Sequence, residues 1–447
     1  MTKRTGILGM TRGGPDFRIP PSTPGGGAWR YGLALPFQAA HGLAAISCNI
    51  RAGFHDFEGG NDVILFSDPA DIHSAQTVPL NRNQAERHPR TGQPAIMVKY
   101  PAHIGFVPFG AKRADGTPHP GAGIGFGLTE VVAWPVGGEV EFRGPDHYEY
   151  LELQQYSYDG KQFRVLRSEH VEVGELLSGW TLYGGPLSNA IPDGDDLLFA
   201  MAGGKLDRRG WFENRPAQGV GAGVTRWRRG QEGWRPVSFT PVTGWDRSME
   251  PSLIRDTDGS FLFCARLSGR NAIRVWRSSR GDKTWAKVIE VSGMTGFGPM
   301  TLNQALDGTP YVAANLYDVL LHPLARRFRA RENSAGVIRG GPAGREKLCI
   351  WPLSSDRTYL ETPVLVRDAY AEFGPAPSGD TWNIDHPSAL TVQLGDHEWH
   401  NIMAMRICDH GEVAPIWIHH GYSPAPQSGT YIEEAISAGE PIPVWNF

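Results

Sequence analysis

One stretch decides the fold of this 447-residue chain: Glu250-Pro251-Ser252-Leu253-Ile254, then Asp258-Gly259, Phe261-Leu262-Phe263-Cys264 and Arg266. Two apolar segments flank an Asp-Gly pair, a sequence typical of a tight turn between antiparallel strands. A third apolar segment ends at Trp276-Arg277-Ser278, and a loop that closes on Trp285 leads into a fourth. Four short strands in this order predict one blade of a β-propeller, with Glu250 on the innermost strand and Arg266 at the end of the second.

The same design recurs along the chain. An apolar segment, a turn and a second apolar segment are found in residues 31–46, 190–199, 300–312 and 386–403. In addition, Trp227-Arg228 with Trp234 resembles Trp276-Arg277 with Trp285, and the two end tryptophans lie 51 residues apart. A period near this length is typical of propeller blades, which must stack on one another to bury both of their faces.

The predicted fold is therefore all-β: a single β-propeller domain over residues 1–447, closed by the two ends of the chain. Six blades fit the pattern best, with five to seven possible. Two polar stretches, residues 81–93 and 323–345, interrupt the short apolar runs, and we expect both to be surface insertions. The 56 glycines and 35 prolines suit many short strands joined by turns.

Charge and hydropathy exclude several kinds of partner. The net charge of −4 leaves no basic field for nucleic acid or for an anionic membrane surface, so we expect neither as a partner. We find no apolar run of about 18 residues that would predict a membrane-spanning helix. The first ten residues lack the apolar segment of a signal peptide. We expect a cytoplasmic protein, or an exported one whose leader has been removed; the oligomeric state stays open.

We find no motif for a nucleotide, a catalytic zinc or a serine nucleophile: no Walker A loop, no HExxH helix and no GxSxG elbow. The four cysteines are widely spaced without a CxxC pair, so we expect no metal and no cofactor. Cys48 and Cys264 lie inside apolar runs and are expected to be small buried core residues.

The segment from Ser278 to Trp285, SSRGDKTW, resembles the Asp-box (BNR) motif S-x-D-x-G-x-T-W of the sialidase-like β-propeller superfamily. Its serine, threonine and tryptophan match the motif, whereas the aspartate and glycine do not. This motif is a structural turn without catalytic residues. The resemblance therefore implies the fold of a divergent member of the superfamily.

Further residues match the sialidase-like site. The resemblance implies a site glutamate at Glu250 and a substrate-binding arginine at Arg266, which follows 16 residues later. It also implies two arginines of the first blade, Arg30 and Arg51, and an acid/base aspartate after them. Two residues fit the aspartate, Asp56 and Asp62. The string Phe17-Arg18-Ile19-Pro20 matches the F/Y-R-I-P string of the same superfamily.

Two residues of the superfamily pattern are missing. A third arginine would lie in residues 298–303, which contain none. The nucleophilic tyrosine would open the last blade, where the chain reads Asp385-His386-Pro387. His386 is the best candidate for the role of that tyrosine because an imidazole transfers protons near neutral pH. The resemblance thus implies the superfamily but not the hydrolysis of sialic acid itself.

Three functions stay open, each with a carbohydrate as the partner. The first is a sialidase-like glycoside hydrolase that cleaves an anionic or hydroxyl-rich glycan at the mouth of the propeller channel. The second is a polysaccharide lyase that acts on uronates by β-elimination with a His or Tyr base and an arginine. The third is a non-catalytic sugar-binding propeller.

For the first function we assign catalysis to Glu250, His386 and either Asp62 or Asp56. Substrate binding is assigned to Arg30, Arg51, Arg266, Trp382 and Asp385. The plain structural alternatives are an ion pair between two strands for Glu250 and Arg266, a turn histidine for His386 and a turn cap for Asp62.

Overall fold

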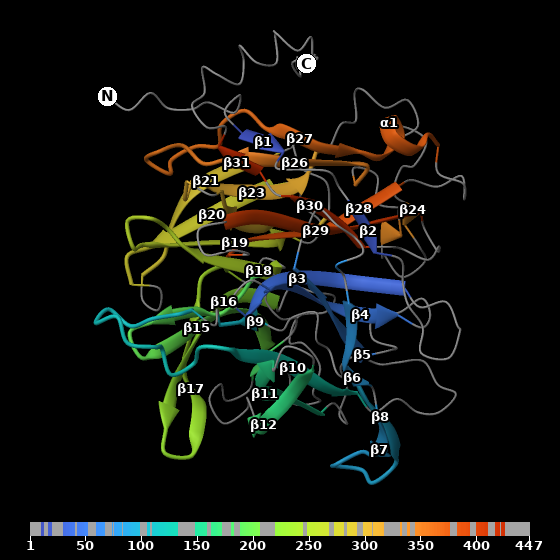
Figure 1. Cartoon of the computed structure of the whole chain (residues 1–447), viewed down its shortest axis with the longest axis vertical. Helices are drawn as coiled ribbons and strands as arrows, with labels where there is room; N and C mark the ends of the chain where they lie inside the picture. Colours follow the sequence, from blue (N-terminus) through green and yellow to red (C-terminus); the bar gives the residue numbers. More distant parts are fainter. Residues whose placement is uncertain are drawn as a thin grey trace.

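Six antiparallel sheets of four to six strands follow one another along the chain in the computed structural model (Figure 1). The structure describes residues 10–12, 17–19, 30–40, 43–51, 60–67, 74, 76–82, 84–98, 105–107, 110–132, 148–158, 162–171, 180–182, 188–205, 220–244, 248–267, 272–280, 284–292, 298–305, 307–316, 331–332, 338–339, 345–375, 382–393, 399–409, 416–420 and 422–424. Within these ranges strands dominate, and no helix has the length and apolar character to span a bilayer.

The first three sheets occupy the N-terminal half. The first contains β3 (Arg30–Ala40), β4 (Leu43–Arg51), β5 (Gly60–Phe66) and β6 (Gln76–Arg82). The second contains β7 (Gln84–Arg87), β8 (Pro94–Val98), β9 (Gly105–Phe106), β10 (Ile124–Val132), β11 (Tyr148–Tyr158) and β12 (Phe163–Val171). The third contains β13 (Trp180–Leu182), β14 (Ile191–Asp193), β15 (Asp196–Lys205), β16 (Val220–Gly230) and β17 (Gly233–Pro241).

The last three sheets share one simple order. The fourth contains β18 (Ser248–Arg255), β19 (Phe261–Leu267), β20 (Ala272–Ser278) and β21 (Ala286–Ser292). The fifth contains β22 (Thr301–Gln304), β23 (Pro310–Asn315), β26 (Lys347–Pro352) and β27 (Val364–Asp368), and the short helix α1 (Ala369–Phe373) follows it. The sixth contains β28 (Trp382–Gln393), β29 (Trp399–Asp409) and β30 (Ile416–His420).

Both ends of the chain contribute to the closure of this ring. The N-terminal strand β2 (Phe17–Ile19) is the outermost strand of the sixth sheet, where it pairs with β30. Beyond it, β1 (Met10–Arg12) pairs with β31 (Tyr422–Pro424) (Figure 1). A further small pair, β24 (Arg331–Glu332) and β25 (Ile338–Arg339), lies within the chain that separates β23 from β26. The predicted meeting of the chain ends is confirmed.

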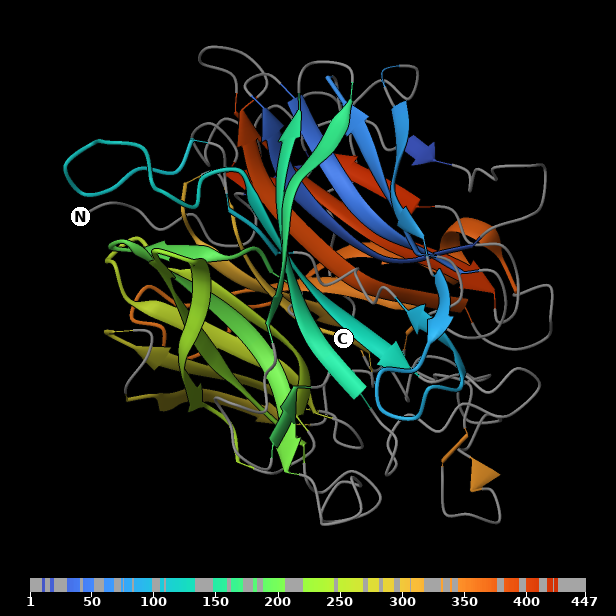
Figure 2. The same ribbon diagram turned by 90° about the horizontal axis from the view of Figure 1, so that it is seen from below.

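The inner strands β14, β18, β22, β28 and β3 lie side by side in that order, and β9 packs on β3. Figure 2 shows the resulting neighbours, with the sheet of β3–β6 beside that of β28–β30 and the sheet of β15–β17 beside that of β18–β21. This arrangement is a six-bladed β-propeller, as predicted. The assignment of all residues to one domain with two insertions stays a prediction, although β7, inside the first insertion, is exposed along its length.

The core lies in layers between successive sheets. Leu198 and Val224 of the third sheet pack with Phe261, Phe263 and Trp276 of the fourth. Similar layers join the fourth sheet to the fifth and the fifth to the sixth. Burial of both faces explains why the decisive stretch is a nearly continuous apolar run, since β19 is buried at every position except Arg266.

The tryptophan repeat also has a structural counterpart. Trp227 and Trp276 occupy the third strands of successive sheets, β16 and β20, and in both strands a bulge shifts the register directly before the tryptophan. Trp276 and Trp285 both pack edge-on to Phe263, at ring-centroid separations of 6.1 and 5.7 Å. The repeated residues are therefore core residues, as aromatic side chains of this size usually are.

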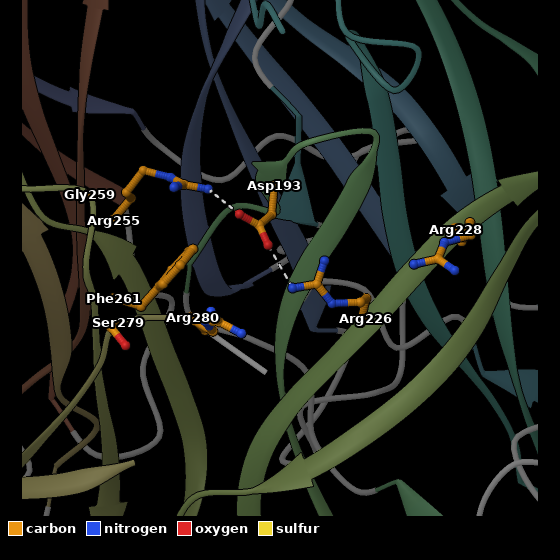
Figure 3. A pocket seen from close by; sticks show the side chains of 8 residues that line it. All are labelled: Asp193, Arg226, Arg228, Arg255, Gly259, Phe261, Ser279 and Arg280. Carbon is orange, nitrogen blue, oxygen red and sulfur yellow. Dashed lines mark hydrogen bonds and ion pairs between the residues drawn. The ribbon is translucent and has the colours of Figure 1, made fainter. Parts of the chain in front are cut away.

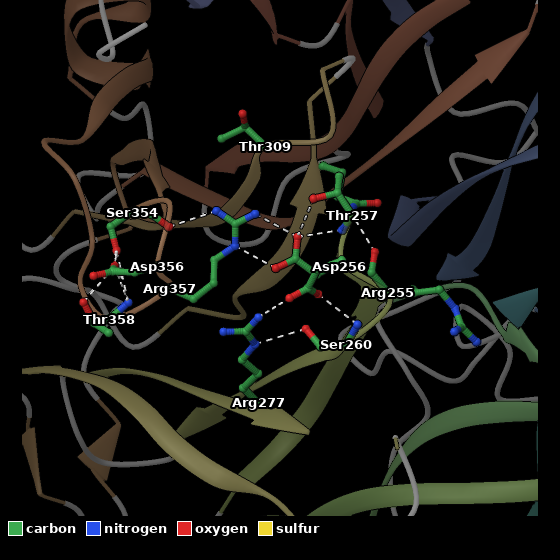
Figure 4. Close-up of polar contacts among 12 residues, drawn as sticks. Arg255, Asp256, Thr257, Ser260, Arg277, Thr309, Ser354, Asp356, Arg357 and Thr358 are labelled. Atoms are coloured by element: carbon green, nitrogen blue, oxygen red, sulfur yellow. Dashed lines mark hydrogen bonds and ion pairs between the residues drawn. The ribbon is translucent and has the colours of Figure 1, made fainter. Parts of the chain in front are cut away.

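A buried ion pair joins the fourth and fifth blades at the end of β18. The guanidinium of Arg357, in the loop before β27, donates two hydrogen bonds to the carboxylate of Asp256, at 2.7 and 2.8 Å (Figure 4). The Asp256 side chain is 1 % exposed and that of Arg357 is 12 % exposed. Asp258, in the turn that follows β18, pairs with Arg277 of β20, but this pair is much more exposed.

Replacing Arg357 by alanine should lower the free energy of unfolding by about 3 kcal/mol, because the buried carboxylate of Asp256 loses its guanidinium. The matched change of Arg277 to alanine should cost less than about 1 kcal/mol, because its partner Asp258 is largely hydrated. Urea denaturation of both variants measures the difference. Equal losses would contradict a specific role for the Arg357–Asp256 pair in joining the fourth and fifth sheets.

Candidate functional site

Three inner strands, β3, β18 and β28, carry a β-bulge near their beginnings, and those of β18 and β28 hold candidate site residues. In β18 the extra residue is Glu250, between the paired residues Met249 and Pro251. In β28 the bulge holds His386 and Pro387. Glu250 has a φ of 50° and His386 a φ of 49°, a left-handed conformation that is uncommon outside glycine. Bulges re-aim side chains, and backbone strain of this kind concentrates at functional sites.

These two bulges direct Glu250 and His386 toward each other. Atom Nε2 of His386 lies 3.6 Å from Oε1 of Glu250. On its other oxygen, Oε2, Glu250 accepts a hydrogen bond of 2.9 Å from Nη1 of Arg266, which lies on β19. The side chains of the three residues are between 11 and 20 % exposed, so they are mostly buried but still in contact with solvent. The structure thus brings together three of the predicted site residues from two sheets.

The carboxylate of Glu250 is held in its ionised form. Burial alone would raise its pKa, but the positive charge of Arg266 and the hydrogen bond and charge of His386 outweigh burial and hold the pKa far below its usual range. Glu250 is therefore unsuited to act as a general acid. It can instead orient His386 and stabilise a proton on Nε2.

Polar side chains of the fifth sheet hold β28 on both sides of His386. The hydroxyl of Thr301 donates to the carbonyl of Pro387 at 2.7 Å. The amide oxygen of Asn303 accepts from the backbone N–H of Ala389 at 2.8 Å. Both side chains are buried. On the other side of His386, the Asn315 amide donates to the carbonyl of Ile384 at 2.8 Å.

The same kind of contact joins β22 to β18. The hydroxyl of Ser252 accepts from the N–H of Leu302 at 3.0 Å, and it lies 3.2 Å from the carbonyl oxygen of the same residue. Ser252 follows Glu250 by two residues, as Ser388 follows His386. Because Leu302 of β22 binds Ser252 and the neighbouring Thr301 binds Pro387, Glu250 and His386 stand at the same level along the inner strands, where they meet.

Arg30 and Arg51 are direct register partners, at the beginning of β3 and the end of β4. Because the inner strands of a propeller run in the same direction, the beginning of β3 lies at the same end of the ring as the beginnings of β18 and β28. The backbone thus places both arginines at the end that carries Glu250 and His386.

The two candidate aspartates differ in their placement. Asp62 lies on β5, the third strand of the first sheet, and is 1 % exposed. Its backbone pairs with Cys48 and Pro79 inside that sheet, away from the inner strands. Asp56 falls outside the described residues, in the connection that follows Arg51.

Trp382 and Asp385 both belong to β28. The indole N–H of Trp382 donates to the carbonyl of Gly374 at 2.7 Å, and the ring lies against Phe373 with centroids 5.3 Å apart. These contacts attach the beginning of β28 to helix α1. Asp385 directly precedes the bulge, and its register partner is Arg406 on β29.

Sequence reasoning missed the residues that position His386, namely Thr301, Asn303 and Asn315. One signal was available: the bulged residues stand in the similar strings Glu250-Pro251-Ser252 and His386-Pro387-Ser388. For metals, the described ranges contain no cluster of three or more His, Cys, Asp or Glu side chains arranged to hold an ion. Cys264 is fully buried, and burial raises the pKa of its thiol.

No family model and no curated protein matches this sequence. Solved structures nevertheless share its fold. A sialidase from Trypanosoma rangeli superposes with a TM-score of 0.54 at 11 % identity, over 97 % of this chain and 61 % of that one. A protein of unknown function from Dyadobacter fermentans superposes with a TM-score of 0.53 at 12 % identity, over 93 % of this chain and 100 % of that one.

A further structure of the T. rangeli enzyme, a covalent intermediate with 2,3-difluorosialic acid, gives a TM-score of 0.52 at 11 % identity. The protein therefore has the β-propeller fold of the sialidases, and the resemblance noted in its sequence is confirmed at the level of the fold. The chain spans about three fifths of the length of the T. rangeli sialidase.

The lowered pKa of Glu250 predicts a specific pH dependence of stability. A carboxyl whose pKa is lower in the folded state stabilises the fold above its unfolded-state pKa, here 4.5, and this contribution is lost as the pH falls below that value. In the Glu250→Gln variant, part of the acid-induced loss of stability should be absent. Urea denaturation between pH 7 and about 3 measures it.

The matched control is Glu290→Gln, in an exposed pair with Arg274 and Lys287. Hydrogen bonds from Lys287 and Arg274 also lower the pKa of Glu290, but solvent screens these exposed contacts, so the control should follow the wild-type pH profile more closely than Glu250→Gln does. A Glu250→Gln profile that also coincides with the wild-type profile would rule out a strongly lowered pKa.

Proposed function

We propose that this protein is a carbohydrate-active enzyme, a sialidase-like glycoside hydrolase that cleaves a glycosidic bond of an anionic or hydroxyl-rich glycan at the mouth of the propeller channel. The observation that supports this proposal most is the convergence of Glu250, Arg266 and His386 on two strained bulges. The fold adds support, since the solved structures that share it include a sialidase.

His386 acts as the base in this proposal. Its Nε2 faces the ionised carboxylate of Glu250, which stabilises the proton on that nitrogen. The second ring nitrogen, Nδ1, is then the one that accepts a proton from an attacking water molecule. The water oxygen forms the new bond to the anomeric carbon while the bond to the leaving-group oxygen breaks.

The leaving-group oxygen takes its proton from a carboxylic acid. Glu250 is unsuited because its pKa is too low. Asp62 lies within the first sheet, two strands away from β3. Asp56 follows the end of β4, where Arg51 stands beside Arg30, and is our preferred acid. The paired arginines Arg30 and Arg51 would bind a carboxylate or hydroxyl groups of the glycan. Arg266 keeps Glu250 ionised.

The segment Ser278–Trp285 would be a variant Asp-box turn. The Ser278 hydroxyl accepts from the backbone N–H of Arg280 at 3.3 Å, and Trp285 packs on Phe263 of the blade core. Both contacts are structural. The proposal assigns no catalytic role to this turn.

A polysaccharide lyase is the second candidate, and one observation favours it. The described site offers a histidine base, an arginine and no carboxylic acid in its protonated form. In a lyase the same Nδ1 of His386 would remove the proton from C5 of a uronate. The electron pair would form the C4–C5 double bond and expel the oxygen on C4, and an arginine would neutralise the uronate carboxylate.

A panel of acidic and neutral glycans, read for reducing ends and for ultraviolet absorbance of unsaturated uronates, separates the candidates. We expect reducing ends without absorbance. His386→Ala should lower the rate by about 100-fold or more, because general base catalysis contributes that much. The control His170→Ala removes an exposed histidine of β12 and should leave the rate unchanged.

A simultaneous rise of both signals would replace the hydrolase with the lyase. If the wild type binds glycans but gives neither signal, and Glu250→Ala binds them equally well, the protein is instead a sugar-binding propeller.

Thr301→Val should lower kcat by about tenfold with little change in KM, because the bulge that aims His386 loses the bond to Pro387. The matched control is Thr243→Val, which removes another buried threonine hydroxyl, bonded to the N–H of Ala222 at 2.9 Å in the third sheet. Each variant should lose about 1 kcal/mol of stability. Equal kcat values in the two variants would show that Thr301 does not position His386.

A further inference from the structure

A cationic pocket opens between the third and fourth sheets, at the far end of β18 from Glu250 (Figure 3). Its volume is about 340 Å³, and its walls include Arg226, Arg228, Arg255 and Arg280. Glu250 is the third residue of β18 and Arg255 is the last. Five residues of strand span about 16 Å, so this pocket is separate from the site of Glu250 and His386.

Ion pairs fix the orientation of the arginines in the pocket wall. Asp193 accepts from Nη2 of Arg255 at 2.9 Å and from Nη2 of Arg226 at 2.6 Å. Figure 3 shows these two arginines reaching Asp193 from opposite sides. Behind them Asp196 binds Arg226 at 3.0 Å and Arg228 at 2.8 Å. The guanidinium of Arg255 also lies 4.4 Å from the ring centroid of Phe261.

Positive charge exceeds negative charge in this wall. Among the residues that the structure describes, four arginines face the two carboxylates of Asp193 and Asp196, which leaves an excess of two positive charges. The neighbouring carboxylate of Asp258 is paired with Arg277, and that of Asp195 is paired with Arg113. Neither therefore offsets the excess.

Arg280 is the clearest part of that excess. It is exposed at the rim of the pocket, and within the described part of the chain no hydrogen bond or ion pair holds its guanidinium. Only its backbone N–H is engaged, by the hydroxyl of Ser278. An arginine beside three others raises the local potential unless an anion is bound.

We propose that this pocket binds a dianionic tetrahedral oxyanion, a phosphate or sulfate, either free or as the phosphate ester of a small molecule such as a sugar. Two negative charges match the excess of two positive charges. Guanidinium groups recognise such oxygens through pairs of charge-assisted hydrogen bonds. The volume of about 340 Å³ lies within the range of small-molecule sites and leaves room for an organic body beside the anion.

Isothermal titration calorimetry at constant ionic strength, on the full chain, tests this proposal. The probes are inorganic sulfate, inorganic phosphate, glucose 6-phosphate and the singly charged glucose 6-sulfate, with chloride as the supporting anion. We expect the three dianions to bind and glucose 6-sulfate to bind more weakly. Arg280→Ala should weaken binding by about tenfold through the loss of charge-assisted hydrogen bonds, and Arg280→Glu should abolish it.

The matched control is Arg229→Glu. Arg229 is an exposed arginine on the same strand as Arg228, but it does not line the pocket. The Arg229→Glu variant changes the net charge by the same amount as Arg280→Glu. If dianion binding falls equally in Arg280→Glu and Arg229→Glu, the proposal is overturned, because the loss then depends on the net charge of the protein alone. An absence of binding by all dianions would also overturn it.

Two further comparisons identify the source of the anion and show whether the pocket is independent of the site of Glu250 and His386. Equal affinity for inorganic phosphate and glucose 6-phosphate supports a free ion as the ligand, whereas tighter binding of the ester supports a phosphorylated small molecule. The His386→Ala variant should bind the dianions like the wild type. Loss of dianion binding in that variant would contradict a separate site, whatever the outcome of the activity assays.

Discussion

The inner strands are held to one another by side chains, because each pairs through its backbone with only one strand of its own sheet. Ser188 binds the N–H of Leu253, Ser252 binds Leu302, and Thr301 binds the carbonyl of Pro387. These buried hydroxyls join four successive sheets and satisfy backbone groups that would otherwise be costly to bury. They also fix the relative heights of β14, β18, β22 and β28. The meeting of Glu250 with His386 depends on that alignment, since a shift of one residue would turn either side chain to the opposite face.

Strand β18 shows how one element can serve two ends of the propeller. Near its beginning the bulge at Glu250 places a carboxylate between a guanidinium and an imidazole, and the local charges nearly balance. At its end, Arg255 binds Asp193 of the third sheet while Asp256 binds Arg357 of the fifth. The second of these pairs is buried and joins two blades, whereas the first belongs to a wall with excess positive charge. The two ends therefore differ in charge: it is nearly balanced around Glu250 and positive in the wall beside Arg255.

The sequence predicted the blades well because their signals are local. The Asp258-Gly259 turn, the apolar run of β19 and the recurrence of Trp227 as Trp276 each depend on neighbouring residues. Glu250, Arg266 and His386, which lie together in the structure, were each named from the sequence, and the roles assigned to them stay predictions. The ion pair of Glu250 with Arg266 joins adjacent strands of one blade and was within reach of the sequence. The approach of His386 could not be predicted from periodicity, because it depends on a contact between sheets far apart in the chain. The left-handed backbone of Glu250 and His386 also opposes the ordinary preference of both residue types, so no propensity indicates it. Asp62 illustrates the opposite case, a carboxylate at a plausible position in the sequence that the register buries within the first sheet.

The two places where the sequence differs from the sialidase pattern lie in contact with each other in the structure. A histidine stands where the superfamily pattern places a tyrosine, and residues 298–303 lack the arginine expected there. That segment instead supplies Thr301 and Asn303, whose side chains bind the backbone of β28 directly after His386. The bulge with its positive φ places Nε2 of His386 3.6 Å from the carboxylate of Glu250. Such a conformation persists only where the surroundings enforce it. Thr301 and Asn303 thus help to maintain the bulge from which His386 reaches Glu250.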